Sequence, residues 1–217
     1  MKLTCLITAG PTREYIDPVR YISNASSGMM GYALAHEAIR RGNRVILVSG
    51  PVKLEPPRKA KIVNVVSASD MFTQVKKYFN VSDIMIGSAA VSDYRPARFK
   101  NEKIKKGKTG LSLKLAVNPD IIAYCGKIKG KRAVAGFALE SENLVKNAAE
   151  KLKSKNLDLI VANSPAAIES GMVKAAILLR DGKKIFAGTL SKEKLAGRIM
   201  DEIIGIWKTR KACKTQP

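Results

Sequence analysis

Apolar residues recur along the chain in short runs separated by helical patterns, which predicts alternating strands and helices. Six apolar runs rich in strand-forming residues lie at residues 3–8, 44–49, 62–66, 84–88, 133–137 and 157–162. Apolar residues with helical spacing lie at residues 28–41, 69–79, 143–154 and 191–207. We expect Gly42 to end the first helix and Ser69 to cap the second. This alternation predicts an α/β fold, a mainly parallel sheet with helices on both faces.

Two segments interrupt the alternation and predict antiparallel additions. Residues Arg98–Leu115 hold two short β-like stretches around a lysine-rich turn, which we interpret as a protruding hairpin or arm. Two further strand-like runs, residues 173–180 and 183–188, flank Asp181-Gly182, a strong hairpin signal. The late part of the sheet should therefore gain an antiparallel pair.

The length and composition favour a single domain. A chain of 217 residues with 46% hydrophobic and 26% charged residues can bury a full core. We assign residues 1–208 to that domain and residues 209–217 to a basic, frayed tail. No apolar run is long enough to cross a bilayer, and no export signal is visible at the start. We therefore expect a cytoplasmic protein without a membrane partner.

Charge and the metal-binding residue types narrow the function classes. The histidine His36 and the three cysteines have no metal-ligand spacing, which argues against a zinc site and a disulfide framework; the cysteines are Cys5, Cys125 and Cys213. Lys and Arg number 39 against 18 Asp and Glu, a net charge of +21. This excess attracts nucleotides, phosphorylated metabolites or nucleic acid, although a solvated basic surface explains most of it equally well.

Ligands of an open parallel sheet bind beyond the carboxyl ends of its strands, so the loops there hold the candidate residues. The loop after the first strand runs from Gly10 to Gly28 and ends in a small-polar run with Asn24, Ser26 and Ser27. We expect Asn24 to be buried and the run to expose amides and hydroxyls to a phosphate. The alternative is that Ser26 or Ser27 is only a helix N-cap. The loop has neither the G-x-G-x-x-G fingerprint nor a Walker P-loop.

Later loops offer further candidates, each with a structural alternative. After the fourth strand, Ala89 and Ala90 let a ligand approach the backbone, and Asp93 is a ligand contact or a turn residue. The arm carries a lysine cluster that can neutralise a triphosphate or serve as a solvated edge, namely Lys103, Lys105, Lys106 and Lys108.

A short helix should begin within the sequence NPDI at residues 118–121. Pro119 suits the first helical position, which makes Asn118 the expected N-cap. Lys151 and Lys155 lie four residues apart on one face of a later helix.

Seven ordered blocks of sequence match one protein family over residues 3–208. They are ITAGPTREYIDPVRYISNASSGMMGYALA, LVSGP, GSAAVSDYRP, EKIKKGK, NPDII, VAGFALE and KNLDLIVAN. With these blocks at this spacing, the chain closely resembles phosphopantothenoylcysteine synthetases. The resemblance implies a Rossmann-like fold that forms a homodimer, with extra strands from the lysine-rich segment in the dimer contact.

The resemblance also implies a reaction. Bacterial members use CTP to activate the carboxylate of 4'-phosphopantothenate as an acyl-cytidylate, with release of pyrophosphate, and the amine of cysteine then displaces CMP. Activation is needed because oxide is a poor leaving group, whereas a nucleoside monophosphate is a stable one. A Mg²⁺ ion is expected on the triphosphate, held mainly by phosphate oxygens and water.

Site residues carry over position by position. Asn24 resembles the asparagine that holds and turns over the acyl-nucleotide, and Lys103 resembles the flap lysine that closes on the triphosphate. Asp93 resembles a nucleotide-loop residue that also lies near the cation. Met29 departs from the family, where a basic residue often stands, and would weaken one phosphate contact. The other positions similar to nucleotide contacts are Gly10, Ser26, Ser27, Gly28, Ala89, Ala90, Asn118, Pro119, Asp120, Ile121, Phe137, Lys151 and Lys155.

In most bacteria this family is fused behind a flavin-dependent decarboxylase. We find no flavin-binding sequence and no catalytic His or Cys candidate, so we expect no FMN. The chain is then either a free-standing synthetase with a separate decarboxylase as a partner or a domain excised from a bifunctional protein. Three alternatives stay open: the same ligase with ATP, a nucleic-acid-binding protein suggested by the charge, and a nicotinamide-dependent reductase suggested by fold alone. Aromatic residues make up only 6% and do not interleave with the basic clusters, which disfavours nucleic acid.

Overall fold

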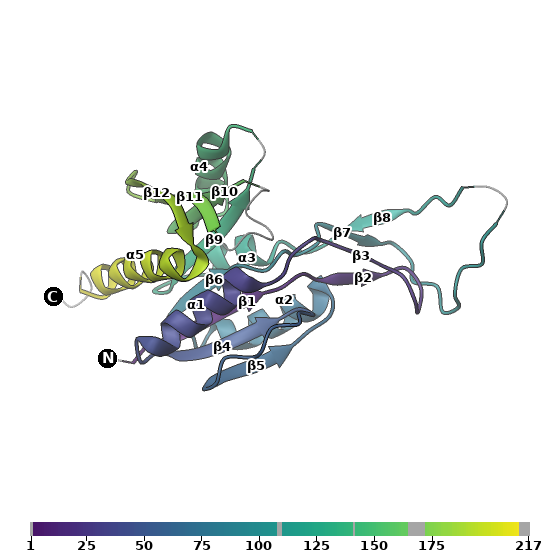
Figure 1. Ribbon diagram of the computed structural model, residues 1–217, viewed down its shortest axis with the longest axis horizontal. Coiled ribbons are helices and arrows are strands. Elements are labelled where there is room, and N and C mark those ends of the chain that lie inside the picture. The colour runs from purple at the N-terminus through teal and green to yellow at the C-terminus, as the bar shows by residue number, and fades with distance from the viewer. Residues whose placement is uncertain (1, 108–109, 141, 165–171, 213–217) are drawn as a thin grey trace.

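The computed structural model describes residues 2–107, 110–140, 142–164 and 172–212 (Figure 1). The main sheet consists of β1 Thr4–Ala9, β4 Arg44–Ser49, β5 Ala60–Asn64, β6 Ile84–Gly87, β9 Ala133–Leu139, β10 Leu159–Asn163, β11 Met172–Leu179 and β12 Lys184–Ser191. Its order is β12-β11-β10-β9-β6-β1-β4-β5. The strands from β10 to β5 pair in parallel, whereas β11 and β12 form the predicted antiparallel addition. The predicted mainly parallel sheet is confirmed.

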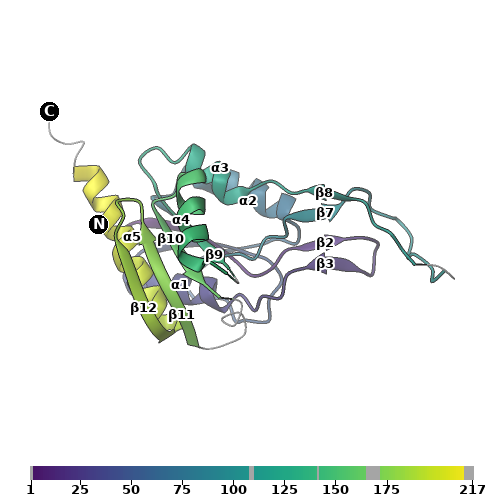
Figure 2. The ribbon, with the colours of Figure 1, turned by 90° about the horizontal axis from the view of Figure 1, so that it is seen from above.

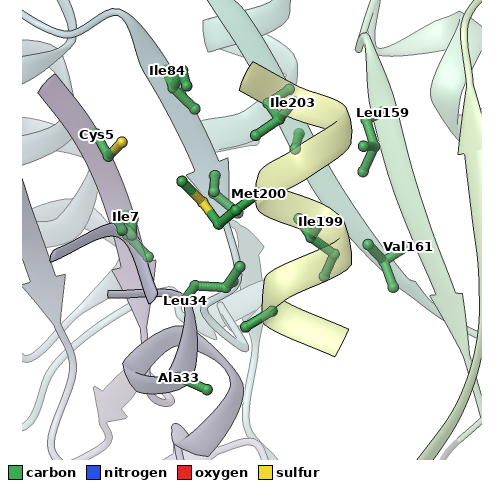
Figure 3. Close-up of a cluster of buried hydrophobic side chains, with 14 of the residues drawn as sticks. Cys5, Ile7, Ala33, Leu34, Ile84, Leu159, Val161, Ile199, Met200 and Ile203 are labelled. Carbon is green, nitrogen blue, oxygen red and sulfur yellow. The ribbon is translucent and has the colours of Figure 1, made fainter. Parts of the chain in front are cut away.

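Helices cover both faces, as predicted. They are α1 Met29–Arg40, α2 Ala68–Phe79, α3 Ile121–Lys127, α4 Leu144–Ser154 and α5 Lys192–Ala212. Because strand side chains alternate, Cys5 and Ile7 of β1 point into the cluster under α1 and α5, with Leu34 and Met200 (Figure 3). Leu6 points into the second cluster, under α2, α3 and α4. None of the described helices is long and apolar enough to cross a membrane.

Two predicted helix caps are wrong by two residues. Ser67, not Ser69, caps α2, because its hydroxyl accepts a hydrogen bond from the Asp70 amide (3.1 Å) while the Asp70 carboxylate accepts one from the Ser67 amide (2.9 Å). This reciprocal pair is a capping box. In α3, Asp120 replaces the expected Asn118, and its carboxylate accepts from the amide three residues later (3.0 Å).

The C-terminal helix is longer than predicted. α5 continues to Ala212, so residues 209–212 are helical and not frayed, while residues 213–217 lie outside the described part. Arg210 in its last turn donates to Asp158 Oδ1 (2.6 Å), and Lys129 Nζ donates to the same oxygen (2.6 Å). The Asp158 side chain is only 1% exposed. A buried ion cluster therefore fixes the end of α5 to the amino edge of the sheet.

Replacing Asp158 with asparagine should destabilise the fold by about 3–5 kcal/mol, because two cations would then face a neutral amide in a buried site. Urea unfolding followed by circular dichroism measures the change. Glu202→Gln is the matched control, since Glu202 pairs with Lys183 at the surface (3.0 Å) and should cost about 1 kcal/mol or less. Equal costs for the two variants would contradict the assignment.

Two small hairpins project from the carboxyl edge of the sheet (Figure 2). One pairs β2 (Arg13–Tyr15) with β3 (Tyr21–Ser23), and the other pairs β7 (Tyr94–Pro96) with β8 (Leu115–Val117). The predicted arm at Arg98–Leu115 does protrude, but its paired strands lie at its base, and the described residues between them form no strand. The first hairpin was missed because three-residue strands give no readable alternation.

Candidate active site

Two glycines meet where the first loop opens into α1. Gly10, after β1, and Gly28, before α1, have left-handed backbones with φ of 74° and 80°. A Cβ on Gly28 would lie 3.3 Å from the Gly10 Cα, and a Cβ on Gly10 would lie 2.8 Å from Val52 Cγ1. Both positions therefore require glycine. The two predicted glycines pack backbone against backbone at the carboxyl edge of the sheet.

Asn24 joins this loop to the loop after β6. Its Nδ2 donates to the carbonyl oxygens of Ala90 (3.2 Å) and Val91 (3.0 Å). The backbone adds hydrogen bonds from Ala90 N to Gly10 O (2.9 Å) and from Thr12 N to Ala90 O (3.3 Å). Asn24 itself is exposed, so the expectation that it is buried is wrong. Its amide oxygen makes no hydrogen bond to a described residue and is available to a ligand.

The serines before α1 do not cap it. The N-cap position belongs to Gly28, without a side-chain hydrogen bond at that position. Ser26 Oγ and Ser27 Oγ accept only long hydrogen bonds, from the amides of Gly28 (3.4 Å) and Met29 (3.5 Å). The simple N-cap alternative for these serines is therefore wrong. Their hydroxyls lie beside the N-terminus of α1, where backbone amides favour an anion.

Asp93 and Asn118 lie together, but only one side chain is free. Asn118 is buried; its Nδ2 donates to Ser92 O (2.9 Å), and its backbone N donates to Asp93 O (2.8 Å). Arg95 Nη1 donates to Asn118 Oδ1 (3.1 Å). The Asn118 side chain therefore holds the loop in place. The exposed Asp93 carboxylate makes no hydrogen bond or ion pair with any described residue.

The two predicted lysines of α4 and its C-terminus already have partners. Lys155 Nζ lies 2.8 Å from Asp120 Oδ2, so two predicted positions meet. Lys151 Nζ lies 2.6 Å from Glu140 Oε1, and this contact lowers the pKa of the Glu140 carboxyl. Glu140 directly follows β9, which places Lys151 beside the carboxyl edge of the sheet. To contact a nucleotide, Lys151 would have to leave or share Glu140, and Lys155 would have to leave or share Asp120.

Three remaining predicted positions differ in what they can offer. Ile121 is buried in the core under α3, so its side chain is committed to packing. Phe137, in β9, and Pro119 are half-buried. At Ile121, only the backbone can contact a ligand. At Phe137 and Pro119, the half-buried side chains can contact one.

Lys103 is not brought to the strand ends. It is exposed in the arm, and the amide of its neighbour Ile104 donates to Asp17 Oδ2 in the β2–β3 turn (3.1 Å). Between that turn and Asn24 lie the three residues of β3, which span roughly 10 Å, more than an extended lysine side chain can reach. Lys108 lies outside the described residues. Sequence reasoning missed Asp17, although Asp17-Pro18 is a turn signal.

Among the residues that the structure describes, no group of three or more His, Cys, Asp or Glu could hold a metal ion. A Mg²⁺ ion that arrives on a triphosphate needs few protein ligands, and the free Asp93 carboxylate fits that requirement. The two thiols in the described part of the chain offer no nucleophile. Burial, and then Asp120, raises the pKa of Cys125 to about 12, and burial, and then Asp83, does the same for Cys5.

Comparison with known proteins identifies the family. The family model described as DNA/pantothenate metabolism flavoprotein C-terminal domain matches residues 1–206. The chain is 42% identical over 208 residues to the coenzyme A biosynthesis bifunctional protein CoaBC of Bacillus subtilis (strain 168), with 94% of this chain and 51% of the relative covered. The chain thus spans about half the length of the curated relatives that it matches.

Solved structures give the same result. The crystal structure of the C-terminal domain of a coenzyme A biosynthesis bifunctional protein CoaBC has a TM-score of 0.84 and 37% identity, over 95% of this chain and 96% of that chain. A Cab2 mutant in complex with phosphopantothenate-cysteine shares the fold, with a TM-score of 0.80 at 17% identity, over 99% of this chain and 89% of that chain. The chain therefore belongs to the DNA/pantothenate metabolism flavoprotein C-terminal domain family, the phosphopantothenoylcysteine synthetase domain of CoaBC proteins.

Proposed function

We propose that the chain is a ligase of coenzyme A biosynthesis that joins 4'-phosphopantothenate to L-cysteine and uses CTP. A carboxylate oxygen of phosphopantothenate attacks the α-phosphorus of CTP, the phosphoanhydride bond breaks, and pyrophosphate leaves. The amine nitrogen of cysteine then attacks the acyl carbon, loses a proton, and displaces CMP. The products are 4'-phosphopantothenoylcysteine, pyrophosphate and CMP.

The observation that carries the proposal is the contact of Asn24 with the loop after β6, beside the glycine pair at the end of β1. The Asn24 amide nitrogen is held by two carbonyl oxygens, which fixes its amide oxygen toward solvent at the sheet edge. The hydroxyls of Ser26 and Ser27 and the N-terminus of α1 adjoin it. Fixed dipoles of this kind can orient an acyl-phosphate and the incoming ammonium or amine without reorganising during the reaction.

The choice of CTP rests on the resemblance of Asn24 and the lysine-rich arm to bacterial synthetases. ATP is the second candidate, and the same site would perform the same chemistry with it. Mg²⁺ would neutralise the triphosphate, with Asp93 as the carboxylate at this edge. The Cab2 mutant was solved with phosphopantothenate-cysteine, which is the product proposed for this chain.

We further propose a homodimer in which each arm completes the site of the other copy. The two hairpins and the arm expose large apolar side chains, as interfaces between subunits do. They are Tyr15, Val19, Tyr21, Tyr94, Phe99, Leu111, Leu113, Leu115 and Val117. The β2–β3 turn holds Lys103 too far from the Asn24 loop of its own chain, so a second copy supplies the simplest way to bring the two together.

The relatives are named bifunctional proteins and are about twice as long, so the decarboxylase step and its FMN are assigned to another domain or to a separate partner chain. Buried free thiols at Cys5 and Cys125 suit the reducing conditions of the cytoplasm, where we place the reaction.

Pyrophosphate release with 4'-phosphopantothenate and Mg²⁺ tests the ligase. CTP should support pyrophosphate release, and addition of cysteine should give phosphopantothenoylcysteine and CMP by mass spectrometry. A preference for ATP would keep the ligase and overturn the cytosine assignment. If neither nucleotide gives product, the ligase assignment is wrong, and the basic surface becomes the candidate binding site for nucleic acid.

A further inference from the structure

Asp17, in the turn between β2 and β3, is a fully buried carboxylate beside the exposed turn residues Val19 and Arg20. Within its own turn it accepts hydrogen bonds from the amides of Val19 (2.9 Å) and Arg20 (2.8 Å). The Arg20 guanidinium adds two more, from Nε (3.0 Å) and Nη2 (2.6 Å). A turn of this kind is complete with the local amides alone.

The fifth hydrogen bond leaves the turn and crosses to the arm. The amide of Ile104 donates to Asp17 Oδ2 (3.1 Å), and the carbonyl of the same residue accepts from Arg20 Nη2 (2.5 Å). Four residues earlier, Lys100 N donates to Ile16 O (3.0 Å). The Asp17–Arg20 pair therefore holds both polar groups of one peptide residue, and that residue directly follows Lys103.

Asp17 remains charged in this setting. Burial alone would raise the pKa of its carboxyl, but the hydrogen bonds from Val19, Arg20 and Ile104 together hold that pKa far below its usual range. Across the pH range in which an enzyme works, the acceptor for the Ile104 amide is thus a full carboxylate.

We propose that Asp17 is a positioning residue for Lys103, which fixes the backbone of the arm through Ile104 and so sets where the lysine ammonium is presented to the triphosphate. The same hairpin continues through β3 into Asn24. It therefore connects the arm, through Asp17 and Ile104, with the asparagine loop of the same chain. This inference rests on the proposed ligase function of Asn24 and Lys103.

The proposal requires that Asp17 act through the lysine. Asp17→Asn keeps the shape and one acceptor oxygen but turns an amide N–H toward the donors of Ile104 and Arg20. We expect a fall of roughly 10- to 100-fold in kcat for pyrophosphate release, because small displacements of a reacting group have costs of this order. The rate at which preformed acyl-nucleotide reacts with cysteine should not change, since cysteine enters after activation.

Glu14→Gln is the matched control. Glu14 is also a buried carboxylate of this hairpin, but it accepts from the amide of Ala68 at the start of α2 (2.8 Å) and makes no hydrogen bond with the described residues of the arm. Hydrogen–deuterium exchange should show faster exchange of residues 100–107 in Asp17→Asn and no change there in Glu14→Gln. Both variants are compared with the wild type for thermal unfolding and dimer mass.

A double-mutant cycle with Lys103→Ala decides the matter. If Asp17 positions the lysine, Asp17→Asn has no further effect on kcat once Lys103 is alanine. If the falls in kcat of the two single variants multiply in the double variant, or if exchange at residues 100–107 is unchanged, Asp17 does not position the lysine. An active wild type would still support the ligase. An inactive wild type would instead overturn the ligase and, with it, the inference. Where Asp17→Asn loses its fold, Asp17→Ser, whose hydroxyl can still accept from the local turn amides but is too short to hold the arm, takes its place in the same cycle.

Discussion

Replacing Lys103 with glutamine should slow pyrophosphate release by roughly 10²- to 10³-fold, the cost of removing one group that stabilises developing charge. The side chain is exposed and makes no hydrogen bond or ion pair with a described residue, so thermal stability should stay within about 0.5 kcal/mol of the wild type. Lys131→Gln, a change at an exposed lysine far along the sequence from the arm, is the matched control and should leave the rate unchanged.

The same variant tests whether the arm acts on the other copy. Asn24→Asp and Lys103→Gln chains, each inactive alone, are co-expressed with different tags. If Lys103 serves the partner, every mixed dimer holds one intact site, and random mixing restores roughly a quarter of the wild-type sites. Mixed dimers that form but stay inactive would show that Lys103 serves its own chain after a movement of the arm.

Replacing Asn24 with aspartate should lower formation of phosphopantothenoylcysteine by about 10²-fold or more while leaving the fold intact. The change removes the Nδ2 donor to Ala90 O and Val91 O and sets a negative charge against those two carbonyls and beside the proposed phosphates. Because Asn24 is exposed, unfolding should change by about 1 kcal/mol or less.

Trapping the acyl-nucleotide shows whether Asn24 is needed for its formation or for its reaction with cysteine. Single-turnover reactions without cysteine measure formation of the acyl-nucleotide, and later addition of cysteine measures its consumption. A variant that unfolds, or one with full activity in both steps, would contradict the role assigned to this amide. Asn147→Asp, which changes an amide on α4 that donates to Glu140 Oε2 (3.1 Å), controls for the added charge.

The candidate site was partly readable in the sequence because its residues sit in loops that follow apolar runs. Gly10, Asn24 and Ala90 were found in this way, and the fold brings them together. The exposure of Asn24 could not be predicted, because the sequence of a long loop does not show which of its polar side chains face solvent. Asp17 was missed because its decisive partner, Ile104, lies 87 residues away.

By itself, the sequence determined the sheet, its mainly parallel pairing and the helices on both faces, because periodicity records local burial. It also determined the family, because seven motifs in order leave little freedom. The tertiary structure alone decided which candidates share a site. It separated Lys103 from Asn24, committed Asn118 to holding a loop, and fixed the end of α5 through Asp158. These outcomes depend on hydrogen bonds and charges between distant segments, whose partners no local pattern of residues specifies.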